Sequence, residues 1–317
     1  MKKLGVILLT LAIAAVIISC GAPKQTFVSI ASGGTGGTYY PLAGAMAAIW
    51  NDGIKGMNAS VQATGASVAN VNLLKEGKAD VIFCQNDITY YAVNGLELFK
   101  DNKYPDLKGV AVLYPETCQL IVLASSGITK VSDLKGKRVA VGAAGSGTEA
   151  NARQIMEAAG VTYADIQVQY LSFNEAASNL KDGNVDAAFV VAGHPTAAVQ
   201  DVAASKTISV VNIDDAIVSK LQSNYPFYTK RTVEAGSYKG VDKNVNTVAV
   251  QAMIAVSSKM DAGTVEMMLQ TLYSKTGSER LTAAHAKAGA MITLQNAQAG
   301  MGIPMHPGAE KFYGKHK

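Results

Sequence analysis

One segment of this chain occurs twice, and this repeat constrains the fold more than any other feature. Residues 73–83 read LLKEGKADVIF, and residues 179–189 read NLKDGNVDAAF. Each residue of the second copy lies 106 positions after its counterpart, as Leu180 does after Leu74. In both copies a helix-like stretch ends at a glycine, and an aspartate leads into an apolar run typical of a buried strand. The repeat therefore predicts two similar α/β lobes, each built on a mostly parallel sheet.

A glycine-rich loop precedes each copy, between a β-prone run and a helix-like stretch. The first loop lies within residues 31–41, and the second spans residues 142–148. Glycines let the backbone approach a ligand closely, and the start of a helix offers free N–H groups to an anion. The first loop lacks the Gly-Lys-Ser/Thr of Walker A and the last glycine of the dinucleotide pattern, so an ordinary strand-to-helix turn is the alternative.

The N-terminus has the pattern of a secretory signal followed by a lipid-attachment cysteine. Residues 4–18 form a largely apolar run of 15 residues, whereas a bilayer span needs about 20. Cys20 follows the small Ser19, as in a bacterial lipobox, although a plain signal peptide with a coincidental cysteine is an alternative. We expect residues 1–19 to be a signal peptide, Cys20 to be lipidated and residues 20–25 to form a tether.

Composition argues against several classes of partner. Removing residues 1–19 leaves 26 Lys and Arg against 24 Asp and Glu, without a basic run that would favour nucleic acid. A hydrophobic fraction of 49% is ample for the cores of two lobes. The four histidines show no metal-ligand spacing, so neither a metal nor a cofactor is expected.

Ligands of open α/β sheets bind beyond the carboxyl ends of the strands, which is where both glycine loops fall. If the two lobes face each other, the loops converge on one cleft and supply N–H and O–H donors to a carboxylate. The expected ligand-binding residues are Gly34, Thr35, Gly36, Gly37, Tyr40, Gln85, Asn86, Asp87, Glu116, Ser146, Gly147, Thr148 and Gly193.

Some of these residues have structural alternatives. Thr148 could be a plain helix N-cap, and so could Asn86 or Asp87. One of the neighbours Tyr39 and Tyr40 is expected in the core.

Charged groups are scarce around the first loop. No arginine precedes Arg138, so we expect neutral donors, rather than an arginine, to hold the ligand's carboxylate. Arg153 is expected to pack beside its helix. Asp87 and Glu116 are the candidate acceptors for a ligand ammonium, although Glu116 could instead be a solvated hinge residue.

Several stretches resemble the TAXI-type solute receptors of tripartite ATP-independent periplasmic (TRAP) transporters: residues 33–41, 85–88, 113–117, 145–153, 171–173, 192–195 and 306–310. The resemblance implies an α/β, two-lobed type II periplasmic-binding-protein fold with a cleft between the lobes. Lobe I would comprise residues 26–115 plus 246–317, and lobe II residues 116–245. It also implies a periplasmic receptor that binds glutamate or a related small carboxylate or amino acid and delivers it to TRAP membrane subunits, without catalysis.

Two other functions are weighed against a receptor. An α/β-hydrolase-like enzyme could use Ser146 as nucleophile and His194 as base, but residues 142–147 do not form the Gly-x-Ser-x-Gly elbow. A structural surface lipoprotein would not need two glycine loops. Cys84 and Cys118 are expected to be buried thiols rather than a disulfide, because cysteine often lies in protein cores.

Overall fold

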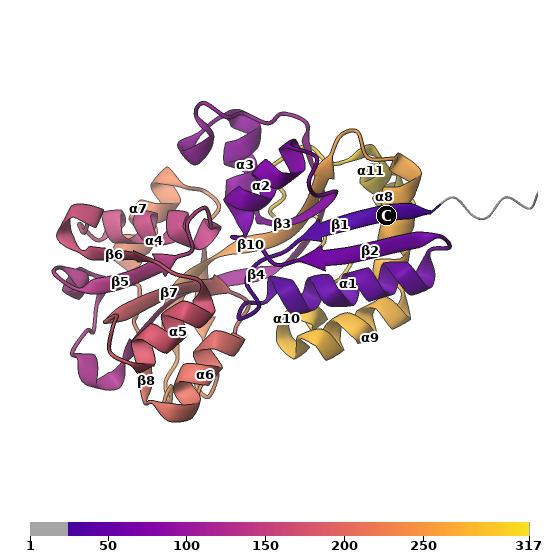
Figure 1. Cartoon of the computed structure of the whole chain (residues 1–317). Coiled ribbons are helices and arrows are strands. Elements are labelled where there is room, and N and C mark those ends of the chain that lie inside the picture. The colour runs from indigo at the N-terminus through magenta and orange to yellow at the C-terminus, as the bar shows by residue number, and fades with distance from the viewer. Residues whose placement is uncertain (1–24, 317) are drawn as a thin grey trace, which may run out of the picture.

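The computed structural model describes residues 25–316. The predicted signal peptide, the lipidation site at Cys20 and nearly all of the tether lie outside these residues. Figure 1 shows two lobes side by side, each with helices on both faces of its strands. Within the described range, no helix has both the length and the apolar character that crossing a membrane requires.

Strands and helices alternate along the chain. The first part forms β1 (Thr26–Ala31), α1 (Tyr39–Gly53), β2 (Met57–Gln62), α2 (Ser67–Lys75), β3 (Val81–Gln85), α3 (Asn86–Asn94) and β4 (Leu107–Leu123). The middle part forms β5 (Arg138–Gly142), α4 (Gly147–Ala158), β6 (Gln167–Tyr170), α5 (Phe173–Lys181), β7 (Ala187–Ala192), α6 (Ala197–Ser205), β8 (Ile208–Val210), α7 (Asp215–Asn224) and β9 (Thr229–Val233). The last part forms β10 (Val245–Ser257), α8 (Ala262–Leu272), α9 (Lys275–Ala284), α10 (Ala286–Met291) and α11 (Pro307–Gly314).

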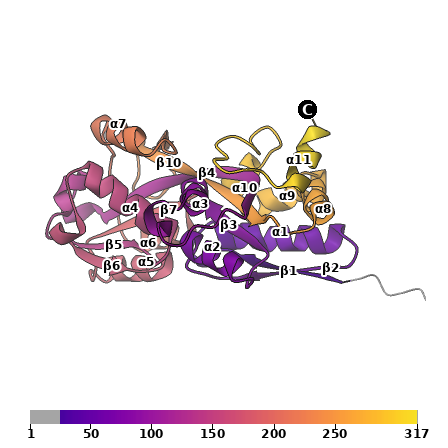
Figure 2. The same ribbon diagram turned by 90° about the horizontal axis from the view of Figure 1, so that it is seen from above.

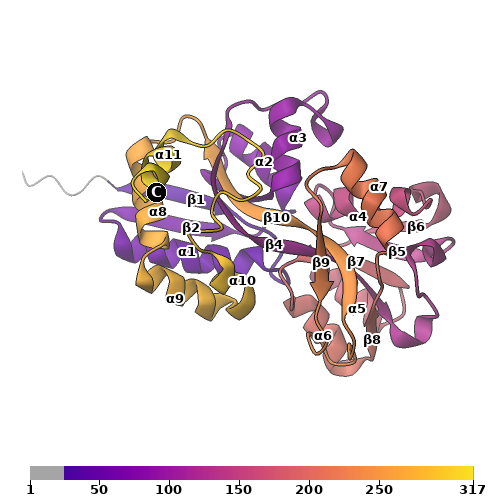
Figure 3. The ribbon, with the colours of Figure 1, turned by 180° about the vertical axis from the view of Figure 1, so that it is seen from behind.

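The strands join in one continuous sheet with the order β2-β1-β3-β10-β4-β7-β5-β6, in which β8 also pairs with β4 and β9 with β10. β1, β2 and β3 are parallel to one another, as are β5, β6 and β7. β4 and β10 run antiparallel to their neighbours and pass from one lobe into the other (Figure 3). The two lobes are therefore joined by paired strands as well as by side-chain contacts.

Each half of the sheet has a hydrophobic core on both of its faces. In one half, α1, α8 and α9 bury their apolar side chains on one face, and α2 and α3 cover the other. In the other half, α4 and α7 cover one face and α5 and α6 the opposite one. Figure 2 shows the two lobes from above. The mixed α/β fold expected from the sequence is confirmed. The predicted division at residues 115/116 and 245/246 falls at β4 and β10 and stays a prediction.

The repeat is structural as well as sequential. α2 and α5 begin and end 106 residues apart, and so do the starts of β3 and β7. Gly77 and Gly183 follow the two helices with φ of +69° and +75°, a conformation that glycine adopts without steric cost. The backbone N–H of Ser29 donates to the Asp80 carboxylate, and that of Arg138 donates to Asp186, both at 2.8 Å. Each repeated aspartate thus ties the start of its strand, β3 or β7, to the parallel neighbour in the sheet, β1 or β5.

Both remaining cysteines lie inside the fold. Cys84 and Cys118 are buried and free, as the sequence predicts. Burial raises the pKa of both thiols, so neither is a reactive thiolate at neutral pH.

Candidate functional site

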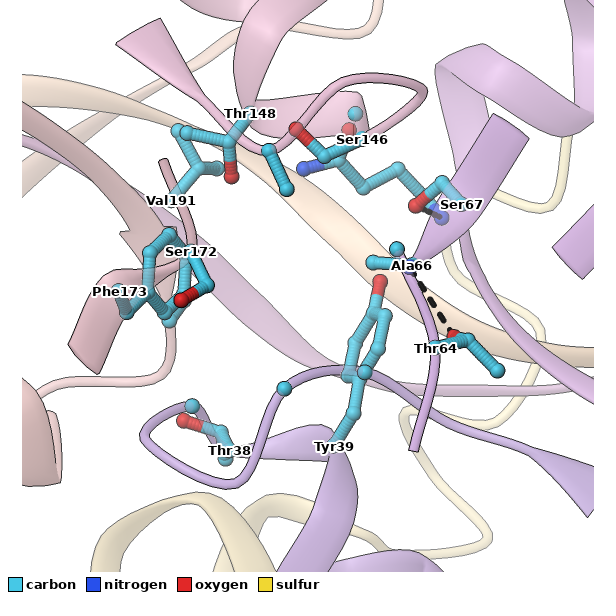
Figure 4. Close-up of a pocket in the computed structure, with 18 of the residues that line it drawn as sticks. Thr38, Tyr39, Thr64, Ala66, Ser67, Ser146, Thr148, Ser172, Phe173 and Val191 are labelled. Carbon is cyan, nitrogen blue, oxygen red and sulfur yellow. Dashed lines mark hydrogen bonds between the residues drawn. The ribbon is translucent and has the colours of Figure 1, made fainter. Parts of the chain in front are cut away.

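A cavity of about 70 Å³ lies between the two lobes. Figure 4 shows its lining side chains converging from both sides. One lobe contributes Gly33, Gly34, Gly37, Thr38, Tyr39, Thr64, Gly65, Ala66, Ser67 and Gln85; Glu116 comes from the middle of β4; the other lobe contributes Ala143, Ser146, Gly147, Thr148, Ser172, Phe173, Val191 and Ala192. The cavity brings together these predicted binding residues: Gly34, Gly37, Gln85, Glu116, Ser146, Gly147 and Thr148.

The first glycine loop presents Tyr39, rather than Tyr40, to the cavity. Tyr39 is 8% exposed and lines the cavity, whereas Tyr40 is 37% exposed and lies outside it. Consecutive helical residues are about 100° apart around the axis, so only one of two neighbours can face the cleft. Tyr39, rather than the predicted Tyr40, therefore lines the cavity, and a binding role for either stays a prediction.

Thr35 and Gly36 contact the opposite lobe rather than the cavity. The Gly36 carbonyl accepts from the Ala198 N–H at 3.1 Å, and Thr35 Oγ1 accepts from Asn174 Nδ2 at 3.1 Å. A Cβ at Gly36 would collide with the Asn174 side chain. The glycine is thus needed for close approach of the lobes, and these two residues are placed outside the cavity lining.

The second glycine loop turns the chain into α4. Gly142 and Gly145 have φ of +105° and +75°, which a side chain disfavours. Ser146 is the N-cap of α4, because its Oγ accepts from the Glu149 N–H at 3.1 Å. Ser146, rather than Thr148, is thus the N-cap of this helix. A Cβ at Gly147 would collide with the Gln85 side chain, so this glycine lets a residue of the facing lobe approach the helix start.

A buried Gln–Glu pair forms one wall of the cavity. Gln85 Nε2 donates to Glu116 Oε2 at 2.9 Å, and each residue is 2% exposed. Burial raises the pKa of Glu116 to about 8, although the Tyr39 hydroxyl and the Gln85 amide oppose the rise. Glu116 is therefore an enclosed carboxyl group rather than a solvated hinge residue.

Asn86, Asp87 and Gly193 are not among the residues that line the cavity. Asn86 Nδ2 donates to the Gly300 carbonyl at 2.9 Å, and Asp87 Oδ2 accepts from Asn151 Nδ2 at 2.9 Å. α3 begins at Asn86, so the turn of the helix carries both side chains away from the cleft after Gln85. The Gly193 carbonyl accepts from Thr38 Oγ1 at 3.0 Å and thereby joins the lobes.

Sequence reasoning missed Val191 and Ala192 at the end of β7 and some residues of the two glycine loops, namely Gly33, Thr38 and Ala143. It also missed two whole segments of the lining, residues 64–67 and the pair Ser172 and Phe173. They follow β2 and β6. The rule that placed the glycine loops at strand ends applies equally to these segments. The repeat relates them as well, because Phe173 stands 106 residues after Ser67.

The proposed nucleophile and base of a hydrolase do not form a pair. His194 Nδ1 lies 2.7 Å from Thr117 Oγ1, and its Nε2 lies 2.8 Å from both Glu234 Oε2 and Lys287 Nζ. Both ring nitrogens are therefore occupied away from Ser146, and His194 is not among the residues that line the cavity. Burial lowers the pKa of His194, which favours the neutral ring.

Arg153 is used within the protein. It lies 2.7 Å from Glu97 and 3.5 Å from Glu157 on its own helix, as expected for a residue that packs beside α4. Over residues 25–316, no cluster of three or more His, Cys, Asp or Glu is arranged to hold a metal ion.

Several solved structures have similar folds. The periplasmic aliphatic sulphonate-binding protein of Escherichia coli is 17% identical, with 92% of this chain and 79% of that chain covered and a TM-score of 0.50. A putative L-cystine ABC transporter protein of Listeria monocytogenes is 17% identical, with 85% and 98% covered and a TM-score of 0.52. A methylphosphonate complex of PhnD1 from Prochlorococcus marinus is 9% identical, with 80% and 88% covered and a TM-score of 0.51.

These similarities define the class: the chain has the two-lobed α/β fold of periplasmic binding proteins. The family follows from the sequence match over residues 30–315, and the chain belongs to the NMT1-like family.

Proposed function

We propose that this protein is an extracytoplasmic solute-binding receptor that binds a small carboxylate or amino acid, such as glutamate, and delivers it to the membrane subunits of a TRAP transporter. The observation that carries the proposal is the cavity between the lobes, lined by neutral hydrogen-bond donors from both of them. None of its described lining residues is Lys or Arg. A carboxylate would be held by the N–H groups at the start of α4 and by hydroxyls such as Thr148 and Ser67.

The contacts around the cavity support a mechanism of lobe closure. The Ala69 N–H donates to the Gly145 carbonyl at 3.0 Å on one side of the cleft, and the Ala198 N–H donates to Gly36 on the other. These bonds must break for a solute to enter. A dry cavity of about 150 Å³ holds benzene. At about 70 Å³ the closed cavity is smaller than even a small amino acid requires, so the lobes would have to separate to accommodate the ligand.

The test is a thermal-shift and calorimetry screen of amino acids and organic acids on the protein from Gly21 onward. A ligand at 100 times its dissociation constant should stabilise the protein by about 2.7 kcal/mol. Small-angle scattering should show compaction at saturation. No shift with any acid, together with an unchanged scattering curve, would exclude the receptor.

An ABC-type transporter is the second candidate for the partner, because the cystine-related neighbour is described as part of an ABC transporter. The motifs shared with TAXI-type receptors favour a TRAP transporter instead. Uptake of labelled ligand by intact cells distinguishes the two: TRAP-dependent uptake should stop when the ion gradient is collapsed, whereas ABC-dependent uptake should stop when ATP is depleted.

The receptor is proposed to be anchored to a membrane by a lipid on Cys20. Replacing Cys20 with Ala should release the protein from the membrane fraction or block its maturation. Native protein that is freely soluble and carries no acyl mass on Cys20 would exclude the anchor. The anchor keeps the receptor beside its membrane subunits, and neither a nucleic acid nor a cofactor has a part in this function.

A further inference from the structure

The segment between β7 and α6 holds lobe II against lobe I. The Gly193 carbonyl accepts a hydrogen bond from Thr38 of lobe I. The next residue, His194, lies 2.8 Å from Lys287, which belongs to α10 of lobe I. Figures 1 and 3 show α10 at the end of lobe I that faces α6. His194 is therefore a titratable group at a contact between the lobes, and it is not among the residues that line the cavity.

The two neighbours of His194 Nε2 make opposite demands on this nitrogen. Lys287 Nζ and Glu234 Oε2 both lie 2.8 Å from it. An ammonium has only hydrogens to donate and a carboxylate has only lone pairs, so Nε2 can serve one of them at a time. The neutral ring can serve either, because Nδ1 lies 2.7 Å from the Thr117 hydroxyl, which can donate or accept. The protonated ring carries a hydrogen on both nitrogens and can serve only Glu234.

Glu234 has a cationic partner in each protonation state of His194. Beside a neutral ring, Glu234 pairs with Lys287 and so joins lobe II to α10. Beside a protonated ring, it pairs with the imidazolium of its own lobe, which repels Lys287. Burial tends to raise the pKa of Glu234, but hydrogen bonds from Lys287 and His194 lower it to about 2. The carboxylate is therefore ionised and available to either partner at any pH at which a histidine titrates.

The surroundings of His194 oppose its protonation while the lobes are together. Its side chain is 1% exposed. Burial lowers its pKa most, the hydrogen bond to Glu234 opposes this, and the charges of Lys287 from α10 and Arg231 from β9 lower it further. Separating the lobes would remove Lys287 and admit water. The open form therefore binds a proton at His194 more readily than the closed form does.

The second histidine at this contact has no such conflict. His285 Nε2 lies 3.2 Å from the Pro195 carbonyl, which can only accept, so this nitrogen carries a hydrogen. A protonated His285 keeps that hydrogen, and with it the bond between the lobes.

We propose that His194 is a pH-sensitive switch between the lobes: the neutral ring allows Lys287 to bridge to Glu234, whereas the protonated ring takes Glu234 and displaces Lys287, so that the lobes separate. The closed form binds fewer protons than the open form. Closure is therefore favoured above the ordinary histidine pKa of about 6.5 and weakens as the pH falls below it. One such group changes the ratio of closed to open molecules by at most about tenfold per pH unit. The switch acts on lobe movement, whichever solute or transporter the protein serves.

The test is small-angle scattering of the ligand-free protein at pH 8 and pH 5. We expect the radius of gyration of the wild type to be larger at pH 5. In His194→Gln, an amide that does not ionise replaces the ring, so the radius should be the same at both pH values. A wild-type radius that does not change, or an equal increase in His194→Gln, would overturn the proposal.

Lys287→Met tests the cation and leaves the histidine in place. Without Lys287, a protonated His194 displaces nothing on α10, so the radius of this variant should not depend on pH over the same range. Expansion at pH 5 equal to that of the wild type would show that the switch does not act through Lys287 and would overturn the proposal.

Two control variants change the same residue types within lobe I. Lys311→Met removes a lysine that pairs with Glu266. His306→Gln removes a buried histidine that caps α11 through Nδ1 and whose Nε2 lies 3.1 Å from the Met260 carbonyl. Both controls should expand at pH 5 as the wild type does. Loss of the expansion in either control would contradict a switch located at His194.

Discussion

The burial of Glu116 should make the ligand-free protein less stable as the pH rises. Its pKa is raised from 4.5 to about 8, chiefly by burial. A carboxyl group with a raised pKa in the folded state stabilises the fold below the unfolded pKa, and this contribution is lost as the pH rises through the folded value. At about 1.4 kcal/mol per pKa unit, the loss between pH 5 and pH 9 is about 4 kcal/mol.

Glu116→Gln isolates this contribution, because the amide does not ionise while every other group titrates as before. The free energy of unfolding of the variant minus that of the wild type should increase by about 4 kcal/mol between pH 5 and pH 9, because only the wild type loses this contribution. For a chain of this size that is a shift in relative Tm of about 10 °C.

The assay is urea unfolding followed by circular dichroism at both pH values, without ligand. Glu266→Gln is the control: Lys311 and Lys315 pair with Glu266 and lower its pKa, so this carboxylate is ionised in the folded state over the whole range and largely ionised in the unfolded state. Its effect on stability should not change between pH 5 and pH 9. If the Glu116→Gln difference also stays constant within about 1 kcal/mol, Glu116 is not enclosed as the structure places it.

The other predictions concern closure and binding. Gly36→Val should weaken ligand binding at least about tenfold by pushing Asn174 away and holding the lobes apart, so scattering should report an expanded molecule even with ligand; compaction equal to wild type would contradict this. Ser146→Ala should weaken binding less than Gly36→Val, because the backbone N–H groups of α4 remain; calorimetry on both variants gives the order. Arg153→Ala should leave ligand binding unchanged, because this side chain pairs with Glu97; complete loss of binding would make Arg153 the anchor of the ligand.

Local patterns in the sequence were sufficient for the elements of the repeat. The boundaries of α2 and α5, the glycines that end them and the strands that follow are encoded within a few residues by helical spacing, turn chemistry and apolar runs. The same local signals placed Gln85, Ser146, Gly147 and other lining residues at strand ends, where ligands of α/β proteins bind.

Other features depend on how the lobes pack, which a pattern along the chain does not contain. Tyr39 rather than Tyr40 faces the cavity because of the rotation of α1 against the sheet. A glycine is needed at position 36 because a side chain there would collide with Asn174, which is far away in sequence. The sequence shows only that Glu116 lies near a crossing between the lobes. It does not show that the side chain is buried there without a nearby cation, which is what raises its pKa.

The sequence by itself thus determined the two α/β units and the strand ends at which a ligand is expected to bind. It could do so because hydrophobic periodicity, glycine conformation and strand direction are set by residues close together in the chain. Only the tertiary structure decided which side chains meet across the cleft and which of them are buried. Burial and hydrogen bonding depend on groups brought together from distant parts of the chain, and the free-energy cost of an unpaired buried atom exists only after they meet.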